Sequence, residues 1–167
     1  AVKDAKEFQE LSGTSGTVDV LVQSKDVTDP KAVKWMIDFQ KAALEKAGYK
    51  GEAPTCAKSE LCPALSLAGL FEGQDLTQAN IRRTLGQVGD FSRGEVTPDR
   101  KMATIAFGLR EEALNDQKKS IDQLRDRIDS KPPPAGTTAR SSASTRKPQT
   151  PAARSAVLSG GCSSRLL

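Results

Sequence analysis

The sequence predicts an α+β domain whose segments follow the order β-α-β-β-α, and three patterns carry this prediction. Residues 17–23 place Val18, Val20 and Val22 on one face, with Thr17, Asp19 and Gln23 on the other, as in a strand with one buried face. Residues 30–47 and 113–129 repeat apolar residues at intervals of three and four, as amphipathic helices do. Residues 101–109 carry apolar side chains on both faces, which is typical of a central strand.

The first helix has clear start and stop signals. Asp29 is a good N-cap, and Pro30 occupies the first helical position, where its missing N–H costs nothing. Gly48 supplies a left-handed stop. Trp35 and Phe39 lie on a face of their own, and we expect them to pack under a neighbouring segment rather than bind a ligand. The expected buried face comprises Val33, Met36, Ile37, Ala43, Leu44 and Ala47.

Residues 49–90 form a long insertion between the first helix and the next expected strand. It contains two cysteines and, over residues 77–88, a helical pattern with apolar residues on one side. Its most apolar part, residues 63–71, is expected to pack on the sheet. The alternatives are that these residues line a substrate path or contact another subdomain.

A hairpin is expected after the insertion. Residues 91–96 and 101–109 have strand patterns, and the link from Thr97 to Arg100 places Pro98 at the second turn position, where its fixed φ fits. The helix over 113–129 follows, and Pro132 to Pro134 end it. Its inward residues are expected to be Leu114, Ile121, Leu124 and Ile128.

One more strand would complete a split βαβ, ferredoxin-like fold. That strand should begin near residues 136–140, but from residue 141 onward the chain is rich in Ser, Thr, Pro and Arg and poor in apolar residues. We therefore expect the domain to lack its last strand and to leave residues 17–23 with an unpaired edge. The expected organisation is a lead-in over 1–16, the α+β domain over 17–140, and a disordered basic tail over 141–167.

Composition narrows the classes of function. The chain has 167 residues, a net charge of +4 and no histidine, which excludes histidine-based triads, bases and metal ligands. Six of the 25 basic residues and none of the 21 acidic residues lie from Lys131 onward, so the preceding part is slightly acidic and a nucleic-acid partner is not expected. No apolar run approaches the roughly 20 residues of a membrane helix, so the polypeptide itself is expected to be soluble.

The candidate catalytic groups all have simpler explanations. Ser12, Thr14 and Ser15 have no histidine to activate them. The glycine-flanked segment 13–16 precedes a strand instead of a helix, so it is not a phosphate-binding loop. The carboxylates of Glu111 and Glu112 interact favourably with the start of a helix. No enzyme activity, catalytic residue, cofactor or metal is therefore expected.

Cys56 and Cys62 are the remaining candidate pair. A zinc site needs four ligands, and Cys162 is the one further cysteine. The residues alone leave a disulfide and two free thiols open.

Four segments together resemble a known family: residues 14–22, 26–36, 61–67 and 96–110. The chain is similar, from about Glu7 to about Arg140, to the first extracytoplasmic porter domain of bacterial RND-superfamily exporters of the MMPL type. Pro133 to Arg140 match the turn and the start of the strand that follow in this family. After Arg140 the sequence departs from the family pattern, either through a reading-frame change or as a genuine disordered tail.

The resemblance implies proton-driven export of lipids or other hydrophobic or amphiphilic molecules. The chain would be a fragment located on the extracytoplasmic side of the bacterial cell membrane. Its partners would be the membrane and porter domains of the same transporter, with a possible oligomer. That oxidising location favours a disulfide between Cys56 and Cys62. The family's proton-carrying residues lie in membrane helices, so none is assigned here. A free-standing ferredoxin-like ligand-binding or regulatory module with a basic tail is the alternative.

Overall fold

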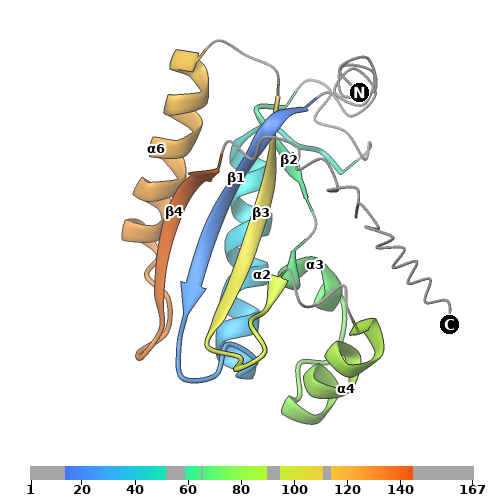
Figure 1. Ribbon diagram of the computed structural model, residues 1–167. Helices are drawn as coiled ribbons and strands as arrows, with labels where there is room; N and C mark the ends of the chain where they lie inside the picture. The colour runs from blue at the N-terminus through green and yellow to red at the C-terminus, as the bar shows by residue number, and fades with distance from the viewer. Residues whose placement is uncertain (1–13, 52–58, 65, 90–94, 111–113, 145–167) are drawn as a thin grey trace, which may run out of the picture.

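The computed structural model describes residues 14–51, 59–64, 66–89, 95–110 and 114–144 (Figure 1). The elements are a mixture of strands and helices, as the predicted α+β class requires. In chain order they are β1 (Thr14–Gln23), α2 (Pro30–Lys46), β2 (Leu61–Pro63), α3 (Leu67–Phe71), α4 (Gln78–Val88), β3 (Met102–Arg110), α6 (Leu114–Ser130) and β4 (Thr138–Ser144).

The four strands form one antiparallel sheet in the order β2-β3-β1-β4. The two central strands, β1 and β3, pair along almost their whole length, with Val20 opposite Ile105. The expected α+β class is therefore confirmed, and β1 and β3 are antiparallel neighbours at the centre of the sheet. Val18, Val20 and Val22 are fully buried because they share one face of β1.

The expectation that the sheet lacks its last strand is wrong. Residues 138–144 form β4, which pairs with β1 so that Leu21 lies opposite Arg140. An edge strand needs few apolar residues, because backbone hydrogen bonds to β1 hold it and Ala139 packs against the core. Arg125 of α6 adds a hydrogen bond from Nε to Oγ of Ser141, at 3.2 Å. The edge of β1 is thus covered, and the rest of the expected tail, 145–167, lies outside the described residues.

The expected hairpin is also corrected. In the described part of the chain, Val96 makes one isolated bridge to Ala103, and residues 91–94 lie outside it. The edge position beside β3 is occupied by β2, which lies within the insertion. Leu61 and Cys62 of β2 are buried there, and Val96, whose bridge to Ala103 lies farther along β3, is buried as well. The turn itself is confirmed, because Arg100 N donates to the Thr97 carbonyl at 2.8 Å.

Helices α2 and α6 lie on the same face of the sheet, where their apolar residues meet the valines of β1 (Figure 1). Helix α2 starts and stops as predicted: Asp29 accepts a hydrogen bond from Lys31 N at 2.8 Å, and Gly48 has φ +81°. Phe39, expected on a separate face, belongs to the core. Leu124 of α6 is also buried, and Ile121 and Ile128 pack partly against the core, as predicted.

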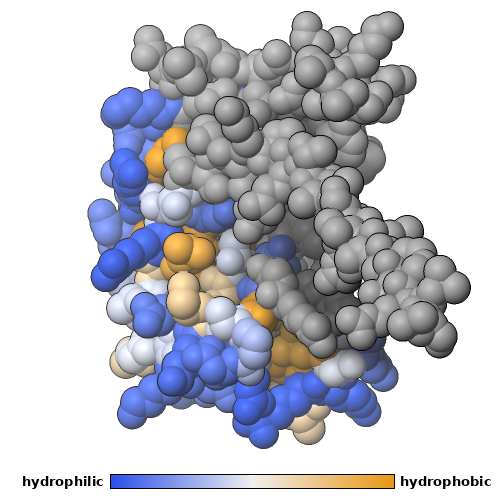
Figure 2. Space-filling view, viewed as in Figure 1, coloured by the Kyte–Doolittle hydropathy of each residue, from blue (hydrophilic) through white to orange (hydrophobic). Residues whose placement is uncertain are grey.

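The opposite face of the sheet has a mixed character. Leu21 and Met102 are the large apolar residues that remain exposed among the described residues, each with 37% of its surface accessible. Figure 2 shows apolar residues scattered among hydrophilic ones over the lower part of this view. A scatter of this kind is ordinary for a protein surface.

Candidate functional site

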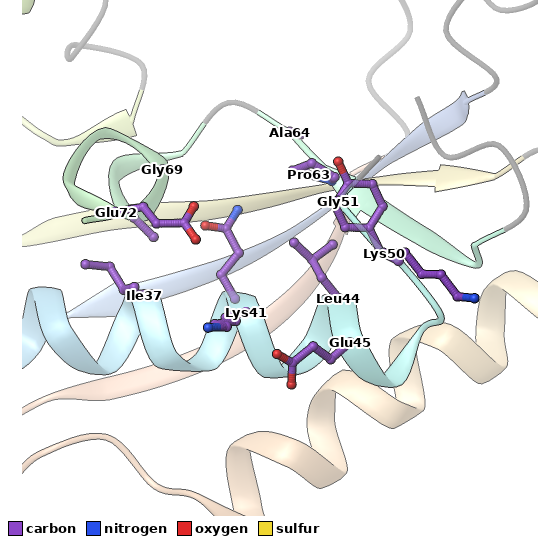
Figure 3. Close-up of a pocket in the computed structure, with 13 residues that line it drawn as sticks. Ile37, Lys41, Leu44, Glu45, Lys50, Gly51, Pro63, Ala64, Gly69 and Glu72 are labelled. Carbon is purple, nitrogen blue, oxygen red and sulfur yellow. The ribbon is translucent and has the colours of Figure 1, made fainter. Parts of the chain in front are cut away.

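A cavity of about 730 Å³ lies between α2 and the segment that contains β2 and α3 (Figure 3). Helix α2 contributes one face, because residues three and four apart lie side by side on a helix. Pro63, Ala64, Ala68, Gly69 and Glu72 form the opposite wall. The cavity, which we call the α2–α3 groove, is lined by Ile37, Gln40, Lys41, Leu44, Glu45, Tyr49, Lys50, Gly51, Pro63, Ala64, Ala68, Gly69 and Glu72.

The walls of the groove combine apolar and charged residues, and the larger part of the lining surface is apolar. Leu44 points from α2 toward Pro63 and Ala64, whereas Glu45, at the rim, points outward (Figure 3). The described residues of the apolar segment 63–71 contribute both to the core and to the groove. Leu67 and Phe71 are fully buried in the core, as expected, while Pro63 and Ala64 line the groove. The groove has the size and lining of a small-molecule site.

One polar side chain is buried in this apolar lining. Gln40 retains 7% of its surface accessible, and its Oε1 accepts a hydrogen bond from Ser66 Oγ at 3.1 Å. Ser66 is the N-cap of α3, and its Oγ in turn accepts from Gly69 N at 3.3 Å. Because that cap uses the lone pair of the serine oxygen, the serine hydrogen is free to point at Gln40. The amide of Gln40 is therefore held with its oxygen toward α3.

The charged residues of the groove lie at its rim. Lys41, Lys50, Glu45 and Glu72 are all exposed. Two cations and two anions in water offset one another, and salt screens each of them. The rim therefore has no strong preference for one sign of charge.

A second polar cluster holds α4 against the loop between β1 and α2. Asp26 Oδ1 accepts hydrogen bonds from the backbone and the hydroxyl of Thr28, and Gln78 Nε2 donates to the same hydroxyl at 3.2 Å. Arg82 lies 3.5 Å from the Asp26 carboxylate. Burial alone would raise the pKa of Asp26, but the Thr28 hydrogen bonds, Arg100 and Arg82 outweigh it and lower the pKa below 3.8. These contacts attach α4 to the loop, and we assign the cluster a structural role.

The cysteine prediction is partly outside the described residues. Cys62 is disulfide-bonded, and its sulfur lies 3.7 Å from the carbonyl oxygen of Gly108 on β3. A disulfide sulfur has no hydrogen to donate, so this is a packing contact. Cys56 lies outside the described residues, and its pairing with Cys62 stays a prediction.

Other residues singled out in the sequence do not meet at a site. Ser12, Glu111 and Glu112 lie outside the described residues, and Thr14 and Ser15 belong to β1. Within the described ranges there is no cluster of acidic or cysteine ligands that could hold a metal ion. Nor does any helix of those ranges combine the length and the apolar character that crossing a membrane requires.

Sequence reasoning missed the two residues that define the polar centre of the groove. Gln40 lies four residues after Met36, inside the apolar stripe of α2, and a polar residue in that position is the signal that could have found it. Ser66 was recognisable only as a polar residue in an apolar run. No family model, curated protein or solved structure matches the chain.

Proposed function

We propose that the chain is an extracytoplasmic porter-type domain of a proton-driven exporter similar to the RND/MMPL family. Its cargo would be lipids or other hydrophobic or amphiphilic molecules. The proposal rests on the resemblance of the sequence and on one structural observation, the apolar α2–α3 groove beside a sheet of order β2-β3-β1-β4. That strand order, with α2 and α6 on one face, supports a ferredoxin-like split βαβ unit.

In this proposal the groove forms part of the path of a hydrophobic molecule. The domain would carry no chemistry of its own, and the proton-carrying residues would belong to the membrane helices of the same transporter. Movement would come from repacking against a sister domain as the membrane part cycles. The exposed Leu21 and Met102, on the face of the sheet opposite α2, offer one surface for such packing.

A free-standing ligand-binding or regulatory module is the second candidate, and the same groove favours it. A pocket with apolar walls and one buried polar group suits a small molecule in either setting. The two functions differ in what surrounds the domain. An exporter requires membrane helices in the same polypeptide, whereas a module does not.

The coding DNA on both sides of this segment distinguishes the two functions. The exporter proposal predicts long apolar segments, each of about 20 residues, encoded upstream and downstream. The downstream sequence is read in all three frames, because residues after Arg140 depart from the family pattern. A complete reading frame without such segments would overturn the exporter and favour the module.

A further inference from the structure

We infer that the α2–α3 groove selects apolar ligands that carry a neutral carbonyl group, such as acyl esters, through a hydrogen bond from Gln40 Nε2. The inference deepens the proposed function and rests on its assignment of the groove as a binding site. The walls of the groove and its centre differ in polarity. The walls are mostly apolar, and Gln40 is a polar side chain that is more than nine-tenths buried among them.

The orientation of the amide decides what the ligand must offer. Ser66 Oγ donates to Gln40 Oε1 at 3.1 Å, which turns the Nε2 end away from α3. Among the described residues, the Gln40 side chain makes one hydrogen bond, in which Oε1 accepts from Ser66. Its Nε2 has no acceptor in that part of the chain. Nε2 is not among the fully buried side-chain atoms that lack a partner, so it is accessible from the groove. A ligand that covers Nε2 would leave this donor unpaired, at a cost, unless it supplies an acceptor at this point.

The charge of the groove favours a neutral acceptor over an anion. Lys41 and Glu72 are both exposed at the rim, as are Lys50 and Glu45, so the charges offset one another. Moving a carboxylate into an apolar groove without a buried cation carries a large desolvation penalty. An ester or amide carbonyl accepts the Gln40 hydrogen bond without that penalty. The geometry therefore selects a carbonyl group attached to an apolar chain.

The test compares matched probes on the full-length chain by competition with an apolar fluorescent dye. Methyl octanoate carries a neutral carbonyl, nonane has no acceptor, and octanoate carries a charge. We expect Gln40→Met, which keeps the length of the side chain, to weaken binding of methyl octanoate about fivefold, the scale of one net hydrogen bond. Binding of nonane should change by less than about twofold. Octanoate should bind more weakly than its ester.

Two further variants complete the design. Lys46→Met, at an exposed position of α2 outside the groove lining, should leave the preference for the ester over nonane unchanged. Ser66→Ala removes the hydrogen bond that holds the oxygen of Gln40, so that the amide can turn. This variant should reduce the preference for the ester over nonane. It decides the outcome if Gln40→Met does not fold. Folding of each variant is checked by circular dichroism.

The outcomes separate this inference from the proposed function. If neither the dye nor any probe binds, the groove is not a ligand site and the proposed function loses its structural support. If the hydrocarbon and the ester bind, but Gln40→Met and Ser66→Ala weaken both equally or neither, the carbonyl selection is wrong while the groove stands. Tighter binding of octanoate than of its ester would also overturn the inference, because the groove would then favour an anion.

Discussion

The indole Nε1 of Trp35 donates a hydrogen bond of 3.1 Å to the backbone carbonyl of Lys131. This bond joins α2 to the residue that follows the end of α6. The indole also stacks on Phe39, with ring centroids 5.1 Å apart, and Phe39 meets Phe107 of β3 edge-on at 6.4 Å. The pair of aromatic residues that the sequence placed on a separate face thus connects both helices to the centre of the sheet, as packing and not as a ligand contact.

Replacing Trp35 with Phe tests this connection. The substitution keeps a ring that can stack on Phe39 but removes the N–H group that bonds to Lys131. We expect the free energy of unfolding to fall by about 1 kcal/mol, because one hydrogen bond and part of the ring contact are lost. Urea denaturation followed by circular dichroism measures it, since the variant has no tryptophan. Lys31→Ala, an exposed position on the same helix, is the control, and an equal effect in both variants would contradict the role of the indole.

Truncation tests whether β4 completes the sheet. A chain that ends at Ser144 should keep the full stability within about 0.5 kcal/mol, because the segment it lacks is poor in apolar residues. A chain that ends at Thr137 loses β4 and exposes the edge of β1, so it should unfold or self-associate. Thermal melting and light scattering compare the two. If the shorter chain is as stable and as monomeric as the longer one, β4 contributes nothing to the fold.

The Asp26 cluster predicts a dependence of stability on pH. Because hydrogen bonds and nearby cations lower the pKa of Asp26 in the folded state below 3.8, its ionised form stabilises the fold. That contribution is complete above the unfolded pKa and is lost as the pH falls through the folded one. Asp26→Asn should therefore cost about 1 kcal/mol at neutral pH, the scale of a partly exposed charged hydrogen bond, and progressively less below pH ~4. Urea denaturation across this range measures the difference, and a constant difference down to pH ~2 would contradict the assignment.

Peptide mapping under non-reducing conditions tests the disulfide. We expect the peptide that contains Cys62 to be linked to the one that contains Cys56. Because the enclosed loop is short, Cys56→Ser should lower the free energy of unfolding by about 2 kcal/mol. Cys162→Ser should leave it unchanged. A peptide that links Cys62 to Cys162 would refute the pairing.

Much of the fold could be predicted because its signals are local. Asp29, Pro30 and Gly48 mark the ends of α2 within the sequence itself, and the valines of β1 reveal its buried face. The strands that were missed depend on distant partners. Residues 61–63 are too few to show a period, and Cys62 finds its place through Gly108. The sequence of β4 is polar and resembles a disordered tail, but its backbone pairs with β1.

The candidate site could not be predicted as a unit. The apolar character of residues 63–71 was visible, but their position across from α2 follows from the docking of β2 on β3. Gln40 and Ser66 are 26 positions apart, and each is unremarkable in its own segment. Only the packed structure shows that one serine hydroxyl caps α3 and also orients a buried amide. The site therefore arises from tertiary packing, not from a motif.

Mapping of ligand contacts by heteronuclear NMR tests most directly the claim that function resides in the α2–α3 groove. The full-length chain is titrated with methyl octanoate, and changes in the amide and methyl signals are followed. We predict saturable changes at groove residues such as Leu44, Ala64 and Ala68, with Leu21 and Met102 on the other face of the sheet unaffected. Changes centred on Leu21 and Met102, or no saturable change at all, would contradict the account.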